Sequence, residues 1–266
     1  MKKILFLAAL IGFSYTSQAQ VLKKIQRKLE DKAEKTVDNV LDKKQPKSET
    51  SSGSVNTSGA IDILTTSEPF LGGTQLIFSD DLRNEAVGSM PRYWQTNSTG
   101  SVVEISGAAG KWLNLAPQAS YQLDTLLQLP SKFTLEFDLL TRASEAKDLR
   151  KIEFGFSKNN NTQKFIYGVS KEVSIYQALQ YYYDNISTNA GTHSSRLPFP
   201  LSNYANAVMH VSMSVDGERL QVYIDQQKVL DAAIIDVNAP KHFYLSTETY
   251  RNNAKAFISN LKIAGF

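Results

Sequence analysis

Apolar residues recur with two different periods along this chain, and the change of period separates an N-terminal helical segment from a strand-rich body. In residues 21–44 they recur every three or four positions, which lines one side of a helix. After residue 59 they alternate with polar residues instead, the pattern of a strand with one buried face. The chain is therefore predicted to be a helical arm followed by a β-rich domain.

The alternating runs in the body predict about a dozen short strands and no long helix. The clearest is residues 133–139, where Phe and Leu alternate with Thr, Glu and Asp. Asp216 and Gly217 separate two further runs and predict a tight hairpin turn. The predicted strands include residues 75–79, 102–105, 111–115, 121–128, 133–139, 152–156, 207–215, 220–224, 243–245 and 257–263. The fold class that we expect is all-β, a two-sheet antiparallel jelly-roll sandwich.

The segments that precede the body differ in composition. Residues 1–19 begin with two lysines, continue with an apolar run and end in small residues, which predicts a secretory signal peptide. Residues 20–44 are the helical arm, and residues 45–59, rich in Ser, Thr and Gly, are a flexible linker. The sandwich domain is expected over residues 60–266. We expect it to be exported to the periplasm, the outer envelope or the extracellular space, with no transmembrane segment after cleavage.

Three roles are open for the helix at residues 21–44. A solvated stalk or a self-associating spacer fits its narrow apolar stripe. The helix could instead dock to a helix of an envelope protein. A third role is binding to a membrane surface, although its apolar face lacks the Trp or Phe that such helices place at the interface.

Charge is unevenly distributed, and this changes the expected partners. Residues 1–47 hold eleven of the 29 Lys and Arg but only five of the 26 Asp and Glu, which leaves the rest of the chain slightly acidic. A body with a net negative charge lacks the stripe of basic residues that neutralises nucleic-acid phosphates, so no nucleic-acid partner is expected. The chain has no cysteine and three widely spaced histidines, which excludes a disulfide framework and disfavours a metal site.

Several stretches of the body resemble the concanavalin A/laminin-G-like β-sandwich superfamily. They are FSDDLRNEAVGSMPRYW (78–94), KWLNL (111–115), LPSKFTLEFDLLTR (129–142), SVDGERLQVYIDQQKVLD (214–231) and FISNLKIAGF (257–266). The body is also similar to the sandwich found ahead of OmpA-like domains in some bacterial envelope proteins. Because no such domain follows Phe266, wall anchoring by that route is not expected. The superfamily often binds calcium, for which Asp80 and Asp81 are the candidates, but no dedicated metal site and no other cofactor are expected.

The resemblance also raises the question of catalysis. Laminarinase-type relatives carry Glu-x-Asp-x-x-Glu on one strand, with two carboxylates acting as nucleophile and acid. Here Glu136 and Asp138 match the first two positions, but Thr141 stands at the third. Glu153, on a neighbouring predicted strand, is the only substitute that we consider. A 3-keto-disaccharide hydrolase-like sandwich is a second enzymatic relative, similar in architecture alone.

An aromatic-rich segment between residues 177 and 204 is the best candidate for ligand binding. It reads as a long polar insertion that carries several tyrosines, and long loops in compact sandwiches are often functional. Aromatic rings stack on the apolar faces of sugars, while amides and carboxylates bind the hydroxyls. Tyr181 and Tyr183 would share one face of an extended segment. The candidate ligand-binding residues are Tyr181, Tyr183, Asp184, Asn185 and Asn203.

These observations support a secreted, non-catalytic interaction module that binds a glycan, such as a polysaccharide or peptidoglycan, or an envelope partner. One alternative is a glycoside-active enzyme of the laminarinase or 3-keto-disaccharide hydrolase type that uses Glu136, Asp138 and Glu153. The other is a purely structural envelope protein. Whether the chain is an enzyme stays open here, with the absent third carboxylate favouring no catalysis.

Overall fold

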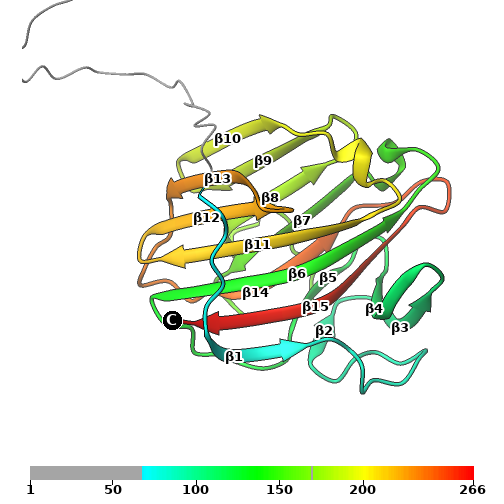
Figure 1. Cartoon of the computed structure of the whole chain (residues 1–266), viewed down its shortest axis with the longest axis horizontal. Helices are drawn as coiled ribbons and strands as arrows, with labels where there is room; N and C mark the ends of the chain where they lie inside the picture. The colour runs from blue at the N-terminus through cyan, green and yellow to red at the C-terminus, as the bar shows by residue number, and fades with distance from the viewer. Residues whose placement is uncertain (1–67, 169) are drawn as a thin grey trace, which may run out of the picture. The chain divides into compact units, whose positions relative to one another are not determined.

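The computed structural model describes residues 68–168 and 170–266, which fold into two antiparallel β-sheets packed face to face. The predicted signal peptide, helical arm and linker lie outside the described residues. Figure 1 is viewed onto the eight-stranded sheet, called sheet A here, with the seven-stranded sheet B behind it. The predicted all-β sandwich is therefore confirmed for this part of the chain.

Each sheet has a simple strand order. Sheet A runs β13 (Gln227–Ala233), β12 (Arg219–Ile224), β11 (Val208–Asp216), β6 (Lys132–Arg142), β15 (Lys255–Gly265), β4 (Ala108–Leu115) and β3 (Gly100–Ile105), and β1 (Gln75–Asp80) also pairs with β15. Sheet B runs β10 (His193–Pro198), β9 (Asn185–Ala190), β8 (Val173–Gln180), β7 (Lys151–Ser157), β14 (His242–Thr247), β5 (Ser120–Leu123) and β2 (Trp94–Thr96). The two short 3-10 helices are η1 (Ala146–Leu149) and η2 (Leu201–Tyr204).

The core forms between the sheets because alternate residues of each strand point inward. On β6, in the middle of sheet A, Phe133 and Phe137 are fully buried. Phe137 meets Phe154 of β7 edge to face, with ring centroids 5.3 Å apart, and Phe133 meets Phe156 at 5.9 Å. These contacts join the central strands of the two sheets. They confirm the inward face that the alternation of residues 133–139 predicts.

The predicted hairpin is confirmed as well. β11 and β12 pair antiparallel, with Val215 opposite Leu220. Gly217 in the turn between them has a φ of 57°, a left-handed conformation that glycine adopts without steric cost. Sheet A is thereby extended beyond β6 to the edge strand β13.

A second, smaller apolar cluster lies on the outer face of sheet A. Trp112, Leu140 and Phe257 point away from the core on three strands of this sheet, yet all three are buried. Side chains of the β3–β4 hairpin pack against them, and the indole nitrogen of Trp112 donates a hydrogen bond to the carbonyl of Ala109. The hairpin is thus held over one end of the sheet.

Two segments without regular structure cross the outer faces. The chain before β1 runs over sheet A (Figure 1), where Gly73 donates a hydrogen bond to Thr134 of β6. The connection between β7 and β8, which we call the strap (residues 158–168 and 170–172), makes hydrogen bonds to β5 and β7 of sheet B. In the described part of the chain, no helix has the length and apolar character needed to cross a membrane.

Candidate functional site

The expected polar insertion at residues 177–204 is largely regular structure, so the prediction of a long loop is wrong. β8, β9 and β10 run through it as antiparallel neighbours, and η2 follows β10. Polar residues that suggested a loop instead alternate along β10, where every second residue is exposed. Such polarity suits a strand at the edge of a sheet, because a hydrophobic edge would invite pairing with other chains.

Tyr181 is a core residue rather than part of a binding surface. Its side chain is 2% exposed, and its backbone N–H donates to the carbonyl of Arg150 at 3.0 Å. Burial raises the pKa of its hydroxyl well above the ordinary value. The prediction that Tyr181 and Tyr183 share one face is therefore wrong, because the extended backbone ends at Gln180 and the chain then turns, with Asp184 in the left-handed region.

The same turn places two other tyrosine rings in solvent. Tyr182 is 50% exposed and Tyr183 67% exposed, and their rings meet edge to face with centroids 4.9 Å apart. The guanidinium of Arg150 lies over the Tyr182 ring, 5.9 Å from its centroid. We call Tyr182, Tyr183 and Asp184 the tyrosine turn. Sequence reasoning named Tyr183 but passed over Tyr182, because alternation in an extended strand would have turned Tyr182 to the opposite side.

Asp184 connects the tyrosine turn to η2. One carboxylate oxygen of Asp184 accepts a hydrogen bond from the backbone N–H of Ser202 at 2.7 Å. Asn203, the next residue of η2, is exposed. Asn185, in contrast, is buried and donates to the carbonyl of Tyr183, so it shapes the turn from within. The structure thus brings Tyr183, Asp184 and Asn203 into one part of the surface.

The two matching carboxylates of the glycosidase motif point outward from sheet A. Asp138 accepts hydrogen bonds from Asn260 at 2.7 Å and is 2.6 Å from the Nδ1 atom of His210 on β11. Glu136 lies 3.5 Å from the Nε2 atom of the same histidine and 3.4 Å from the Lys262 ammonium. We call these five residues the histidine cluster. His210 joins the carboxylates because β11 pairs with β6 in a register that sets it opposite Asp138.

Electrostatics hold the histidine cluster together. The hydrogen bond to Asp138 raises the pKa of His210, and the nearby charges of Asp138 and Glu136 act in the same direction. Burial by itself would raise the pKa of Asp138. The hydrogen bonds from His210 and Asn260 and the charge of His210 outweigh burial and hold the pKa of Asp138 below its usual value. Both shifts therefore favour the pair of an ionised Asp138 and a protonated His210.

Glu153 lies in the other sheet, and the three candidate carboxylates do not converge. It points outward from β7 of sheet B, 3% exposed, beneath the strap. Its carboxylate accepts a hydrogen bond from the N–H of Gly168 at 2.8 Å and pairs with Lys151 at 2.7 Å. Since β6 and β7 belong to different sheets, the outer faces that carry Glu136 and Glu153 are opposite sides of the sandwich. A retaining pair needs about 5 Å between carboxyl groups, which this arrangement does not provide.

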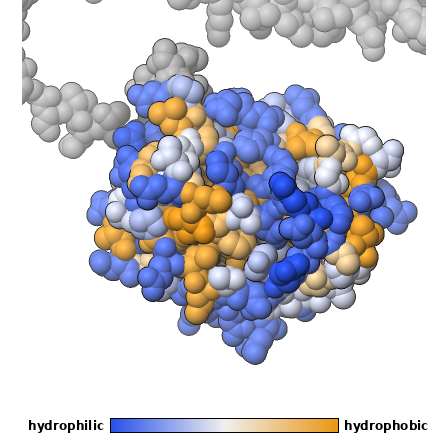
Figure 2. Space-filling view, turned by 60° about the horizontal axis from the view of Figure 1, so that its bottom comes forward, coloured by the Kyte–Doolittle hydropathy of each residue, from blue (hydrophilic) through white to orange (hydrophobic). Residues whose placement is uncertain are grey.

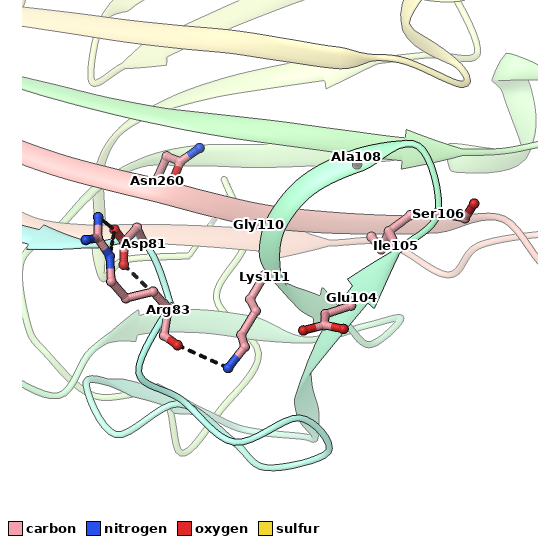
Figure 3. Close-up of a pocket in the computed structure, with 9 residues that line it drawn as sticks. All are labelled: Asp81, Arg83, Glu104, Ile105, Ser106, Ala108, Gly110, Lys111 and Asn260. Carbon is pink, nitrogen blue, oxygen red and sulfur yellow. Dashed lines mark hydrogen bonds and ion pairs between the residues drawn. The ribbon is translucent and has the colours of Figure 1, made fainter.

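A polar groove of about 780 Å³ lies beside the histidine cluster, and sequence reasoning missed it. Figure 3 shows it between the loop that follows β1 and the β3–β4 hairpin, with β15 at its back. Its polar lining residues are Asp81, Arg83, Glu104, Ser106, Lys111 and Asn260. They come from three segments far apart in the sequence, so only the folded chain assembles them.

The candidate calcium residues are already bound by protein donors. Asp80 accepts hydrogen bonds from the backbone N–H of Leu82 and from the Trp94 indole, and its pKa is raised mainly by burial. Asp81 pairs with Arg83. Within the residues that the structure describes, no group of three His, Asp or Glu side chains could hold a metal ion.

Comparisons with known proteins agree on the fold. No family model and no curated protein matches the chain. Among solved structures, the exoplasmic/lumenal domain of VIP36 in its Ca²⁺/Man-bound form is 15% identical, covers 71% of this chain and 89% of its own, and has a TM-score of 0.52. Its Ca²⁺/Man3GlcNAc-bound form is 14% identical over 71% and 88%, with a TM-score of 0.51. The chain therefore shares a β-sandwich fold with these domains, and at this identity the likeness concerns the fold alone.

Proposed function

We propose that this chain is an exported, non-catalytic module that binds a glycan through the tyrosine turn. The observation that carries the proposal is the exposure of two adjacent tyrosine rings, Tyr182 and Tyr183, at the end of the β8–β9 hairpin. Large aromatic rings are usually buried, and exposed ones commonly serve recognition. Sugar rings present apolar C–H faces that stack on such rings.

Polar groups stand where a stacked sugar would need them. Asp184 uses one carboxylate oxygen to fix η2, and its other oxygen has no hydrogen bond within the described residues. The exposed amide of Asn203 follows in η2. A carboxylate and an amide next to aromatic rings can bind sugar hydroxyls while the rings contact the apolar face. Because the turn is held by backbone hydrogen bonds, little conformational entropy would be lost on binding.

The fold is compatible with the same assignment. VIP36, which shares the fold, has been solved with Man and with Man3GlcNAc bound. Catalysis is disfavoured because Glu153, the candidate third carboxylate, lies on the opposite side of the sandwich from Glu136 and Asp138. We place the module outside the cytoplasm on the basis of the predicted signal peptide. We assign to residues 21–44 the task of holding it to an envelope partner.

The test is retention of the purified full chain on immobilised mannan, chitin, a β-1,3-glucan and peptidoglycan. The Tyr182→Ala/Tyr183→Ala double variant removes both rings, and we expect its affinity to fall roughly tenfold or more, since each stacking contact is worth about 1 kcal/mol. Tyr167→Ala is the matched control, because Tyr167 is 43% exposed and belongs to the strap, not to the tyrosine turn. It should bind as the unmodified chain does.

The outcomes separate the candidate functions. Retention that only the double variant loses supports a glycan site at the tyrosine turn. Retention that the double variant keeps would move the site elsewhere on the sandwich. A chain that is retained by none of the four supports would overturn glycan binding and favour the structural envelope role.

A further inference from the structure

We propose that the polar groove beside the histidine cluster is a second binding site, built for an uncharged oligosaccharide. The groove is separate from the tyrosine turn and does not depend on it. Its volume of about 780 Å³ lies within the range of roughly 300–1,000 Å³ that is typical of small-ligand sites. Figure 2 shows the molecule from the side that is at the bottom of Figure 1, where extensive hydrophilic areas adjoin an apolar band.

The charges of the groove cancel, which argues against an ionic ligand. Asp81 and Arg83 pair with each other. The ammonium of Lys111 donates to two backbone carbonyls, those of Arg83 at 3.1 Å and Glu85 at 2.6 Å. Glu104, which is paired with Lys111 across the β3–β4 hairpin, supplies the balancing negative charge (Figure 3). With two positive and two negative side chains, the groove has no net attraction for a phosphate or for a cation.

Several hydrogen-bonding groups of the groove nevertheless lack a partner within the described residues. No hydrogen bond or ion pair reaches the carboxylate of Glu104 or the hydroxyl of Ser106. Asn260 uses only its amide nitrogen, which donates to Asp138, so the amide oxygen can accept. The groove therefore offers acceptors and a donor at separate points. Hydroxyl groups, which both donate and accept, match such a set, and the apolar surface of Ile105 and Ala108 can contact the C–H face of a sugar.

These groups are positioned by contacts made outside the groove. Asn260 lies at a bulge of β15, where the pairing with β6 shifts register, and its φ of 54° turns the side chain toward Asp138. β-Bulges often re-aim a side chain beside a functional site. Lys111 and Arg83 are likewise held by their own partners. A ligand would meet a lining that is already ordered, which lowers the cost of binding.

The experiment is a titration of the ¹⁵N-labelled full chain with soluble gluco-, manno- and xylo-oligosaccharides, followed by amide chemical shifts. We expect shifts at Ser106, Gly110 and Lys111 on binding of at least one of these uncharged oligosaccharides. The Glu104→Ala/Asn260→Gly double variant removes two ligand contacts, and glycine accepts the left-handed backbone at position 260. Its affinity should fall about tenfold or more. Glu218→Ala, an exposed acid in the β11–β12 turn, should change nothing.

Two further variants keep the result interpretable. The single variant Glu104→Ala changes an exposed side chain and should leave the fold intact. Weaker oligosaccharide binding by this variant would support the groove as the binding site even if the double variant unfolds. The Tyr182→Ala/Tyr183→Ala variant should keep the groove shifts whether or not the tyrosine turn binds glycans. Absence of groove shifts with every uncharged oligosaccharide, or tighter binding of an oligouronate than of the neutral oligosaccharides, would overturn the proposal.

Discussion

The outer faces of the two sheets start from the same alternating pattern but end in different environments. On sheet A, Glu136 and His210 point outward and stay partly open to solvent. On sheet B, Ser120, Gln122 and Glu153 also point outward, yet each is at most 3% exposed because the strap lies over them. The comparison teaches that an outward polar position is not necessarily a surface position.

The covered face of sheet B is satisfied mainly by backbone groups of the strap. Ser120 accepts a hydrogen bond from the N–H of Ile166 at 2.7 Å, and the Gln122 amide donates to the carbonyl of Asn159 at 3.0 Å. Gly168 donates to Glu153. A buried polar group without a partner costs about 1–3 kcal/mol, and these hydrogen bonds avoid that cost for most of the covered face. The exceptions among the described residues are Oε1 of Gln122 and the hydroxyl of Tyr244, which have no partner.

The open face of sheet A is satisfied by side chains instead. Asp138 is bound by His210 and Asn260, and Glu136 by His210 and Lys262. Side-chain ion pairs that retain contact with water contribute little to stability, typically about 0–1 kcal/mol. Removing a charge from the open face should therefore cost little stability, whereas removing one from the covered face should cost more.

The largest difference is expected between the two glutamates. Glu153→Ala would leave the N–H of Gly168 without its partner beneath the strap and would remove the closer of the two carboxylates on Lys151, which keeps Glu248 at 3.6 Å. We therefore expect a loss of about 2–3 kcal/mol of unfolding free energy. Glu136→Ala removes a partly solvated ion pair and should cost about 0–1 kcal/mol. Urea unfolding of both variants measures the difference. Equal losses would mean that the strap does not seal its face.

A smaller loss of stability is expected when a substitution displaces the strap from sheet B. A Cβ at Gly168 would come within 2.2 Å of the Tyr176 ring, so Gly168→Ala forces the strap or the ring to move and should cost about 1–2 kcal/mol. Amide hydrogen exchange at Ile166 should become faster. Gly72→Ala is the control on sheet A, because a Cβ there meets only Glu136 and Phe70, at 3.3 Å and 3.7 Å. Unchanged exchange at Ile166 in the Gly168 variant would argue against a tightly packed strap.

The smallest effect is an opposite pH dependence of the two histidines. The folded-state pKa of His210 is raised, so its contribution is complete below about pH 6.5 and is lost as pH rises through the raised value. Burial lowers the pKa of His242 on β14, so stability is lost there as pH falls through about 6.5 toward the lowered value. Unfolding free energies of His210→Gln and His242→Gln across this range should deviate from the parent with opposite slopes. Parallel profiles would contradict the assigned environments.

Much of the fold was predictable from local pattern, and the exceptions have a common cause. Residues 133–139 and the Asp216–Gly217 turn behave as predicted, because alternation and turn chemistry act over a few residues. β10 was missed because its edge position permits the Ser and His that otherwise indicate a loop. β9 was missed because it carries Ser, Thr and Asn although it lies inside the sheet, between β8 and β10.

The candidate sites were predictable only in part. Tyr183 and Asp184 lie in the tyrosine turn and Asn203 lies in η2, which Asp184 contacts, whereas Tyr181 is buried because the chain turns directly after β8. Nothing local distinguishes Tyr181 from Tyr182. No sequence pattern predicted the polar groove, because Asp81, Glu104 and Asn260 are separated by long stretches of sequence.

By itself the sequence determined which residues of each strand point inward, since that choice follows from the two-residue period and from the burial of apolar side chains. The tertiary structure decided which outward residues remain accessible and which of them meet. His210 joins Asp138 through strand pairing, and Ile166 covers Ser120 through a long connection. Such contacts depend on register and coverage between distant segments, which no local pattern specifies.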